Sequence, residues 1–403
     1  MPKSFPGLEE APGAGGGLTS ASEKRLFAIA LGVSLGYLVA LAQLFTSHRW
    51  ILDAQGRPLL TDFVAIWSAG SLALEGAALT AYNGALQHAA EVAALKHGFE
   101  GQYGWPYPPS FLFVAETLAR LPYGWSFAIW IGVSLGLYGL AIGAVARRYS
   151  AMIVAFAAPW TLACAIVGQN GFLTASLFGL ALVTLEKRPR LSGLLLALLT
   201  YKPQFGLLIP LALAMDGRWR TMAFAVAGAV VLIGLSSAAF GPDTLTAFVQ
   251  GLPHTTQTLV TNGGVGWAKL QSVYGLTRAL GGSDGIGWAA QCVMTLTAAI
   301  LVAVTWRSQA PFNLKAATLT AAAALSTPYI FVYDMPLLAV AVAFLYRQRR
   351  FDRWDYSALA LASLTVALGS IFSTAIPLGI FASLMIAATA LRQVAENSEF
   401  TVR

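Results

Sequence analysis

Charged residues are scarce in this sequence. Asp, Glu, Lys and Arg make up 11% of its 403 residues, while hydrophobic residues make up 57% and the mean hydropathy is +0.66. Because a soluble domain carries about 25% charged residues, this chain lacks the polar groups that a water-facing surface needs. The deficit excludes a soluble enzyme, a disordered regulator and a nucleic-acid-binding protein, and it favours one large membrane domain.

The sequence also has little that would bind a metal or a nucleotide. Its two cysteines, Cys164 and Cys292, lie in apolar runs, and we interpret them as packed hydrophobic side chains. The four histidines have no metal-ligand spacing, and Asp352 and Asp355 are too far apart for an Asp-x-Asp motif. No glycine-rich phosphate-binding motif is present. We therefore expect neither a metal nor a cofactor.

The chain begins with a polar segment, which is followed by an apolar run. Residues 1–23 are rich in Gly, Pro, Ala and Ser, and we expect a disordered cytoplasmic tail there. The uncharged run 26–46 is long enough to cross the ~30 Å hydrocarbon core as a helix. Residues 47–108 carry several charges and turn signals, so they form a large first external loop with short helices over about 62–78 and 84–97.

Beyond this loop, apolar segments alternate with basic clusters and with polar breaks of little net charge. The basic clusters lie at 147–148, 186–190, 216–220, 307–315 and 347–353, and the breaks at 168–171, 201–204, 241–287 and 326–329. Placing every cluster in the cytoplasm satisfies the positive-inside rule and makes 241–287 a second external loop. We predict an all-α, polytopic membrane domain over residues 24–395, with about twelve transmembrane or half-spanning helices, a tail at 396–403 and both termini cytoplasmic.

This orientation requires residues 191–214 to turn back at Tyr201-Lys202-Pro203. Each piece has about 11–12 residues and is only ~17 Å long, so the two pieces form half-helices or short tilted spans. One kinked span is the alternative, and it places the 347–353 cluster outside.

Several segments resemble one known family in their order along the chain. The first-loop segment 61–70 (TDFVAIWSAG), followed by Ala81-Tyr82-Asn83, is similar to the first-loop signature of glycosyltransferase family 87. The later matches are Tyr107-Pro108-Pro109, Leu121-Pro122-Tyr123, Gly168-Gln169-Asn170, Tyr201-Lys202-Pro203-Gln204, Ser326-Thr327-Pro328-Tyr329 and Tyr333-Asp334. The resemblance implies a GT-C-like fold related to polyprenyl-phosphate-mannose-dependent mannosyltransferases. Some members carry a late-loop histidine where this chain has Tyr329 and Asp334, which leaves the sugar open.

The resemblance also implies a reaction. A sugar, with mannose favoured, would pass from a polyprenyl-phosphate-sugar donor to a hydroxyl of a glycan or glycolipid acceptor, with inversion at the anomeric carbon. The active site would lie on the periplasmic or external side of the plasma (inner) membrane, in contact with membrane lipid and without nucleic acid. Such a transfer needs a base for the hydroxyl proton, charge stabilisation for the leaving phosphate and polar groups that orient the sugar.

Two charged residues stand out at the expected external face. Asp62 is the candidate catalytic base, because partial burial near the membrane boundary raises a carboxyl pKa; Thr61-Asp62 is also suited to cap the following helix. Lys202 is the only cation in its apolar stretch. Because a lysine at membrane depth costs about 2.5–3.5 kcal/mol, we interpret Lys202 as a phosphate contact. Snorkelling to lipid headgroups is the alternative.

Polar residues beside the apolar spans complete the predicted site. The amides of Gln169 and Asn170 suit a sugar or a phosphate, although a plain turn role fits the sequence equally well. Asp334 is predicted to orient the sugar or to pair with Lys202, and capping of the next helix is the alternative.

Two tyrosines belong to the predicted substrate-binding set. Tyr107 offers a flat face that stacks on a sugar, with a place in the interfacial aromatic belt as the alternative. Tyr329 enters the set through the family resemblance.

Two other functions remain open at this point. A secondary transporter or lipid-linked-sugar flippase would also use broken helices with a Lys and an Asp at membrane depth. The large first loop argues against it, because transporters seldom place their chief acidic motif there. A non-catalytic scaffold of an envelope-assembly complex is the third hypothesis.

Overall fold

The computed structural model describes residues 20–101, 103–349, 351–371 and 375–401. Within these ranges the regular elements are helices, which confirms the all-α prediction, and the few extended contacts are isolated bridges. The tail predicted for residues 1–23 lies almost wholly outside the described residues. The last helix continues to Thr401, into the segment predicted as a C-terminal tail.

In the described part of the chain, four helices are long and apolar enough to cross a membrane. They are α1 (Ser20–Thr46), α5 (Tyr123–Ala146), α11 (Trp219–Phe240) and α14 (Asp284–Arg307). A fifth span results if α6 (Ser150–Phe156) and α7 (Pro159–Val167), bent by 65° at their break, count as one. The structure therefore supports a membrane protein, but it does not confirm the predicted count of about twelve crossings.

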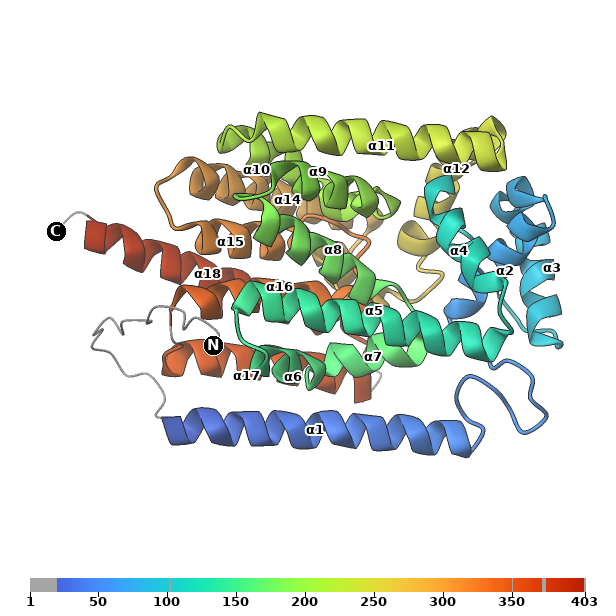
Figure 1. The fold of residues 1–403 in the computed structure, drawn as a ribbon, viewed down its shortest axis with the longest axis horizontal. Coiled ribbons are helices and arrows are strands. Elements are labelled where there is room, and N and C mark those ends of the chain that lie inside the picture. Colours follow the sequence, from blue (N-terminus) through green and yellow to red (C-terminus); the bar gives the residue numbers. More distant parts are fainter. Residues whose placement is uncertain (1–19, 102, 350, 372–374, 402–403) are drawn as a thin grey trace, which may run out of the picture.

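The remaining helices of the bundle are shorter or less apolar and pack between these spans. They are α8 (Gly171–Thr184), α9 (Pro189–Leu198), α10 (Ile209–Met215), α15 (Phe312–Leu325), α16 (Pro336–Gln348), α17 (Arg353–Ile371) and α18 (Gly379–Thr401). Helix α15 is buried from Ala316 to Leu325 because its alanines let neighbouring backbones approach closely. In Figure 1 the helices lie side by side, with α1 at one edge and α11 at the opposite edge.

The chain reverses between α9 and α10, through the short helices η3 (Leu199–Tyr201) and η4 (Pro203–Gly206). Helix α9 runs in the same direction as α11, since Gly193 packs on Thr221 and Phe224 while Ala197 meets Gly228 further along. Helix α10 ends just before α11 begins, which is the level at which α9 also begins. The chain therefore returns along α10 in the direction opposite to α9. The segment is therefore the predicted hairpin of short helices, with Lys202 at its turn, and not one kinked span.

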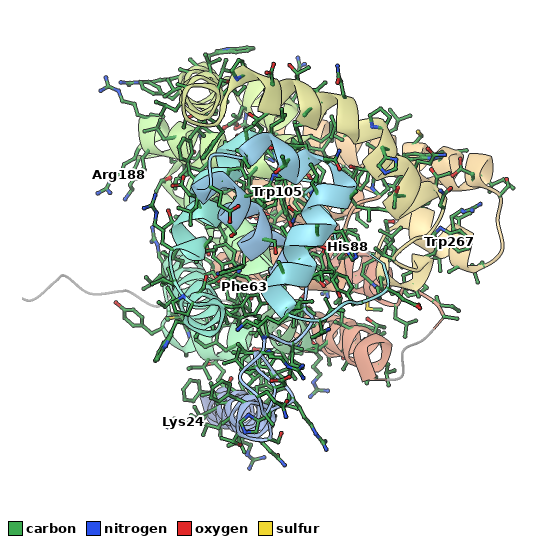
Figure 2. The ribbon with its side chains drawn as sticks, turned by 90° about the vertical axis from the view of Figure 1, so that its right-hand side faces the viewer. Lys24, Phe63, His88, Trp105, Arg188 and Trp267 are labelled. Atoms are coloured by element: carbon green, nitrogen blue, oxygen red, sulfur yellow. The ribbon has the colours of Figure 1, made fainter. Side chains whose placement is uncertain are left out.

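Short helices from the two long loops, and the two helices that directly follow the first loop, gather at one end of the bundle, at the right of Figure 1. They are α2 (Phe63–Leu74), η1 (Ala78–Tyr82), α3 (Gly84–Leu95), η2 (Pro109–Phe111), α4 (Leu112–Ala119), α12 (Pro242–Thr256), η5 (Gln257–Thr261), η6 (Trp267–Lys269) and α13 (Val273–Ala279). Helices α2 and α3 confirm the two helical patterns predicted in the first loop. Figure 2 looks onto this end, with His88 and Trp105 from the first loop and Trp267 from the second.

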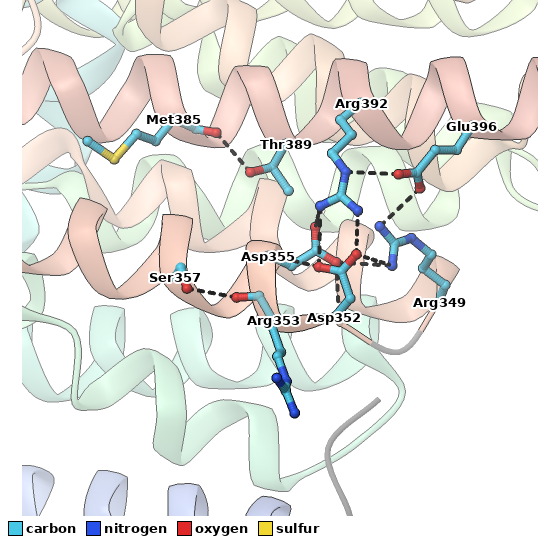
Figure 3. Close-up of polar contacts among 9 residues, drawn as sticks. All are labelled: Arg349, Asp352, Arg353, Asp355, Ser357, Met385, Thr389, Arg392 and Glu396. Carbon is cyan, nitrogen blue, oxygen red and sulfur yellow. Dashed lines mark hydrogen bonds and ion pairs between the residues drawn. The ribbon is translucent and has the colours of Figure 1, made fainter. Parts of the chain in front are cut away.

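The start of α1 and the end of α18 both lie at the opposite end of the bundle (Figure 1). There, ion pairs join the start of α17 to α18 (Figure 3): Arg392 contacts Asp352, and its Nε lies 2.8 Å from Glu396 Oε1. Arg349 reaches Asp355 Oδ2 at 3.1 Å and Glu396 Oε2 at 3.2 Å. Asp352 and Asp355 therefore anchor two helices to each other.

Candidate functional site

A cavity of about 1020 Å³ lies where the two long loops, 47–108 and 241–287, meet the hairpin and the loop before α16. Six of the seven predicted site residues line it: Asp62, Tyr107, Gln169, Lys202, Tyr329 and Asp334. They come from segments up to 272 residues apart in sequence (334 − 62), so the fold brings together most of the set that the sequence indicated.

Asp62 occupies the N-cap position of α2, but its side chain makes no capping hydrogen bond. The residue after it, Phe63, is fully buried against the rings of Tyr123 and Phe127, and this packing fixes the start of α2 beside the cavity. Burial raises the pKa of Asp62 to about 6, against the opposing effects of a hydrogen bond from Gln169 and of nearby lysines. A carboxyl with this pKa is mostly ionised at neutral pH and suited to accept a proton.

Gln169 connects Asp62 to Tyr107. Its Nε2 donates to Asp62 Oδ2 at 3.4 Å, and its Oε1 accepts from the Tyr107 hydroxyl at 3.1 Å. The turn that aims Gln169 depends on Gly168, which has φ +73° and sits where a Cβ would lie 2.6 Å from the Phe127 ring and 2.7 Å from Phe63 Cβ. Glycine is the residue that fits such a position. The result is a hydrogen-bonded row that orients the carboxylate toward the cavity.

Lys202 and Asp334 form a buried ion pair across the cavity wall. Lys202 Nζ lies 2.5 Å from Asp334 Oδ1, and Asp334 Oδ2 accepts from the Phe331 backbone N–H at 3.1 Å. The two residues are 4% and 1% exposed, so Lys202 does not snorkel to headgroups. Burial raises the pKa of Asp334, and the charge of Lys202 opposes that shift.

The late loop that carries Asp334 packs closely on the start of α8. At Gly171 a Cβ would lie 1.7 Å from the backbone oxygen of Tyr333. Above it, the Tyr329 hydroxyl is 2.6 Å from Thr256 Oγ1, which joins the late loop to α12. Tyr329 and Thr256 both line the cavity, so this contact forms part of its wall.

Asn170 is the one predicted site residue that does not line the cavity. It is fully buried, and its backbone oxygen accepts hydrogen bonds from Thr174 Oγ1 at 3.1 Å and from the Tyr201 hydroxyl at 3.3 Å. Its position matches the plain turn role that the sequence left open.

A buried carboxylate behind the cavity holds the first-loop segment that lines it. Glu91 of α3 is fully buried and accepts hydrogen bonds from the backbone N–H groups of Tyr103, at 3.3 Å, and Gly104, at 3.1 Å. Both of these residues and Tyr107 line the cavity. Glu91 was not singled out from the sequence, because a lone Glu in a loop helix resembles a solvated residue.

Lys269 is a second cavity-lining cation that sequence reasoning missed. It is the only lysine in the second long loop, 241–287, and this isolation is the sequence feature that could have identified it. The cavity also has apolar walls on two sides: Phe248 and Leu252 of α12 on one, and Val366 of α17 with Leu378 on the other. The site thus combines three carboxylates (Asp62, Glu100 and Asp334), two cations and apolar surface. No group of His, Cys, Asp and Glu side chains in the described ranges is arranged to hold a metal.

Comparison with known families gives one match. The profile of glycosyltransferase family 87 matches residues 105–332, which is more than half of the chain. The matched range includes Tyr107, Gln169, Lys202 and Tyr329, while Asp62 and Asp334 lie outside it. Comparison with curated proteins and with solved structures finds no match.

Proposed function

Because this chain belongs to glycosyltransferase family 87, we propose that it transfers a sugar, with mannose favoured, from a polyprenyl-phosphate-sugar donor to a hydroxyl of a glycan or glycolipid. The family and the apolar helices make the protein a membrane glycosyltransferase. The donor, the sugar, the acceptor and the residue roles are the proposal.

The proposal rests on the position of Asp62, which accepts a hydrogen bond from Gln169 and lines a cavity that also contains two lysines. In the proposed step, Asp62 takes the proton of the acceptor hydroxyl, and the acceptor oxygen forms a bond to the anomeric carbon. The bond from that carbon to the phosphate oxygen breaks, and its electron pair leaves with the polyprenyl phosphate. Attack on the face opposite the leaving group inverts the anomeric centre.

The other polar residues position the donor in this scheme. Tyr107 and Gln169 orient Asp62, and Tyr107 offers its ring to the sugar. An ammonium group has three N–H donors, so Lys202 keeps donors for sugar or phosphate oxygens while Asp334 accepts one of them. Tyr329 contributes to the wall beside α12. Asn170 acts through the turn that it builds and not through contact with substrate.

The apolar cavity walls support a lipid-linked donor, because a polyprenyl chain needs apolar surface next to the polar centre. The basic clusters support an orientation in which the cavity faces the external side, while the start of α1 and the end of α18 face the cytoplasm. On this view the protein resides in the plasma membrane.

One feature favours a different function. A broken hairpin around a buried Lys–Asp pair also suits a secondary transporter or lipid-linked-sugar flippase. Proteoliposomes loaded with labelled polyprenyl-phosphate-mannose separate the two functions. The proposed enzyme transfers the label to a hydroxyl acceptor and stops doing so in Asp62→Asn. Movement of the label across the bilayer without transfer, unchanged in Asp62→Asn, would establish the flippase instead.

A further inference from the structure

The two cations at the cavity differ in how their charges are balanced. Lys202 is buried and paired with Asp334 at 2.5 Å, so the pair presents almost no net charge to an incoming anion. Lys269 is exposed and forms no ion pair within 4.0 Å among the described residues. An uncompensated ammonium attracts a phosphate far more strongly than a neutralised one does. Lys269 is therefore the cavity cation that is better suited to bind an anion.

Lys269 also lies near the candidate base. Among the charges that lower the pKa of Asp62, Lys269 acts more strongly than Lys202. Glu100 lines the cavity as well, but it makes no ion pair with Lys269 within 4.0 Å. A phosphate on Lys269 would therefore be close to the carboxylate that accepts the proton.

The backbone at Lys269 is fixed, although its side chain is free. Gln271 Nε2 donates to the backbone oxygens of Ala268, at 2.8 Å, and Lys269, at 3.2 Å. Gln271 Oε1 accepts from the Gly379 N–H at 2.7 Å, and its own N–H donates to Ile330 oxygen at 2.7 Å. Gln271 thus ties the segment that carries Lys269 to the start of α18 and to the late loop.

This attachment places Lys269 beside one of the two apolar walls. Leu378 and Gly379, at the start of α18, line the cavity together with Val366 and Gly369 of α17. The wall continues directly from the Gln271–Gly379 contact, so polar and apolar surfaces meet there. A lipid phosphate requires that junction: a cation for the headgroup and an adjacent apolar path for the chain.

We propose that Lys269 binds the phosphate of the donor and that the polyprenyl chain lies along the α17–α18 wall. This inference rests on the proposed function and refines it by separating the two lysines. When the bond between the anomeric carbon and the phosphate oxygen breaks, the leaving phosphate gains one negative charge, and Lys269 stabilises that charge. Lys202 and Asp334 instead hold the hairpin against the late loop and orient the sugar.

Binding of polyprenyl monophosphate to purified protein in lipid nanodiscs tests the inference. Polyprenol without a phosphate and inorganic phosphate serve as separate probes. We expect Lys269→Ala to weaken polyprenyl-phosphate binding at least tenfold, Lys269→Arg to retain most of it, and polyprenol binding to stay unchanged. Arg49→Ala is the matched control, because it removes an exposed cation that does not line the cavity. Val366→Trp should weaken binding of both lipids.

The possible failures are distinguishable. If the wild-type protein binds polyprenyl phosphate no better than polyprenol, the proposed donor is wrong and the inference fails with it. If the wild type binds polyprenyl phosphate and Lys269→Ala binds it equally well, only the inference is overturned. If inorganic phosphate competes fully and Val366→Trp has no effect, the site takes free phosphate, and the lipid path along α17–α18 is wrong.

Discussion

Lys202 Nζ lies 2.5 Å from Asp334 Oδ1, although 132 residues separate them in sequence. The pair joins the turn of the hairpin to the late loop, and both side chains are buried. Each of these charges needs the other, because an unpaired charge in such a place is costly. The contact therefore fixes two walls of the cavity relative to each other.

Removal of one partner of this pair should destabilise the protein. We expect Lys202→Met to lower the free energy of unfolding by about 3–5 kcal/mol, and a Lys202→Met/Asp334→Leu double variant to recover most of that loss. Thermal unfolding in detergent measures both effects. Lys187→Met, at an exposed position away from the cavity, is the control. A double variant that is no more stable than Lys202→Met would show that the pair is not a stabilising unit.

The pH dependence of transfer should report Asp62. Because burial raises the pKa of Asp62 to about 6, the base is protonated below that pH, and activity should fall as pH decreases through about 6. An Asp with an ordinary pKa would keep its activity to about pH 4. The test is the pH profile of kcat/KM, which reports the free enzyme, measured between about pH 4.5 and about pH 8 at constant ionic strength. A rate that stays flat down to about pH 4.5 would argue against Asp62 as the base.

Gln169 should tune that pH dependence. Its hydrogen bond favours the ionised form of Asp62, so Gln169→Leu should move the midpoint of the pH profile upward by roughly one pH unit and, through the lost ionisation, slow transfer at neutral pH about twofold. Tyr107→Phe leaves the Gln169 contact to Asp62 in place, so it should slow transfer without moving the midpoint. Identical midpoints in Gln169→Leu and the wild type would disprove the orienting role.

Close packing between α8 and the late loop gives a steric prediction. An added Cβ at Gly171 would lie 1.7 Å from Tyr333 oxygen, whereas at Gly206, in the hairpin, it meets nothing within 4 Å. Gly171→Ala should therefore cost about 1–3 kcal/mol and abolish transfer by displacing Asp334. Gly206→Ala should behave like the wild type in both respects. Equal stability and activity of the two variants would refute the close approach.

The sequence made much of the site predictable, because its chemistry is carried by scarce charges. In a chain with 11% charged residues, an Asp at the start of the first loop and a single Lys in an apolar stretch stand out. Their partners could be identified only from the fold, since Gln169 and Asp62 are 107 residues apart in sequence and Lys202 and Asp334 are 132 apart. The expected Lys202–Asp334 pairing is found, and Lys202 does not snorkel. Asp62 makes no capping hydrogen bond, whereas Asp334 also has a capping role, since it accepts from the Phe331 N–H at the start of the short helix η7 (Val332–Asp334).

What the sequence missed depends on tertiary contacts. Gln169 and Asn170 are adjacent and follow the positive-φ turn at Gly168, yet Gln169 lines the cavity while Asn170 is fully buried and does not line it. Lys269 lies in a segment of little regular structure that Gln271 attaches to Gly379, and no local pattern predicts that attachment. The number of membrane spans could not be predicted from hydropathy either, because the hydropathy of short helices such as α9 and α10 does not indicate how deep they lie in a membrane.

Transfer by a single-residue variant of Asp62 shows directly whether this carboxylate is the catalytic base. Labelled polyprenyl-phosphate-mannose and a hydroxyl acceptor are incubated with the wild type, Asp62→Asn and Asp53→Asn; Asp53 is a first-loop carboxylate that pairs with Arg57 and does not line the cavity. We predict that Asp62→Asn lowers the transfer rate by about 10²-fold or more, the lower end of what a general base contributes, while Asp53→Asn stays near the wild-type rate. Transfer by Asp62→Asn at the wild-type rate would contradict the account.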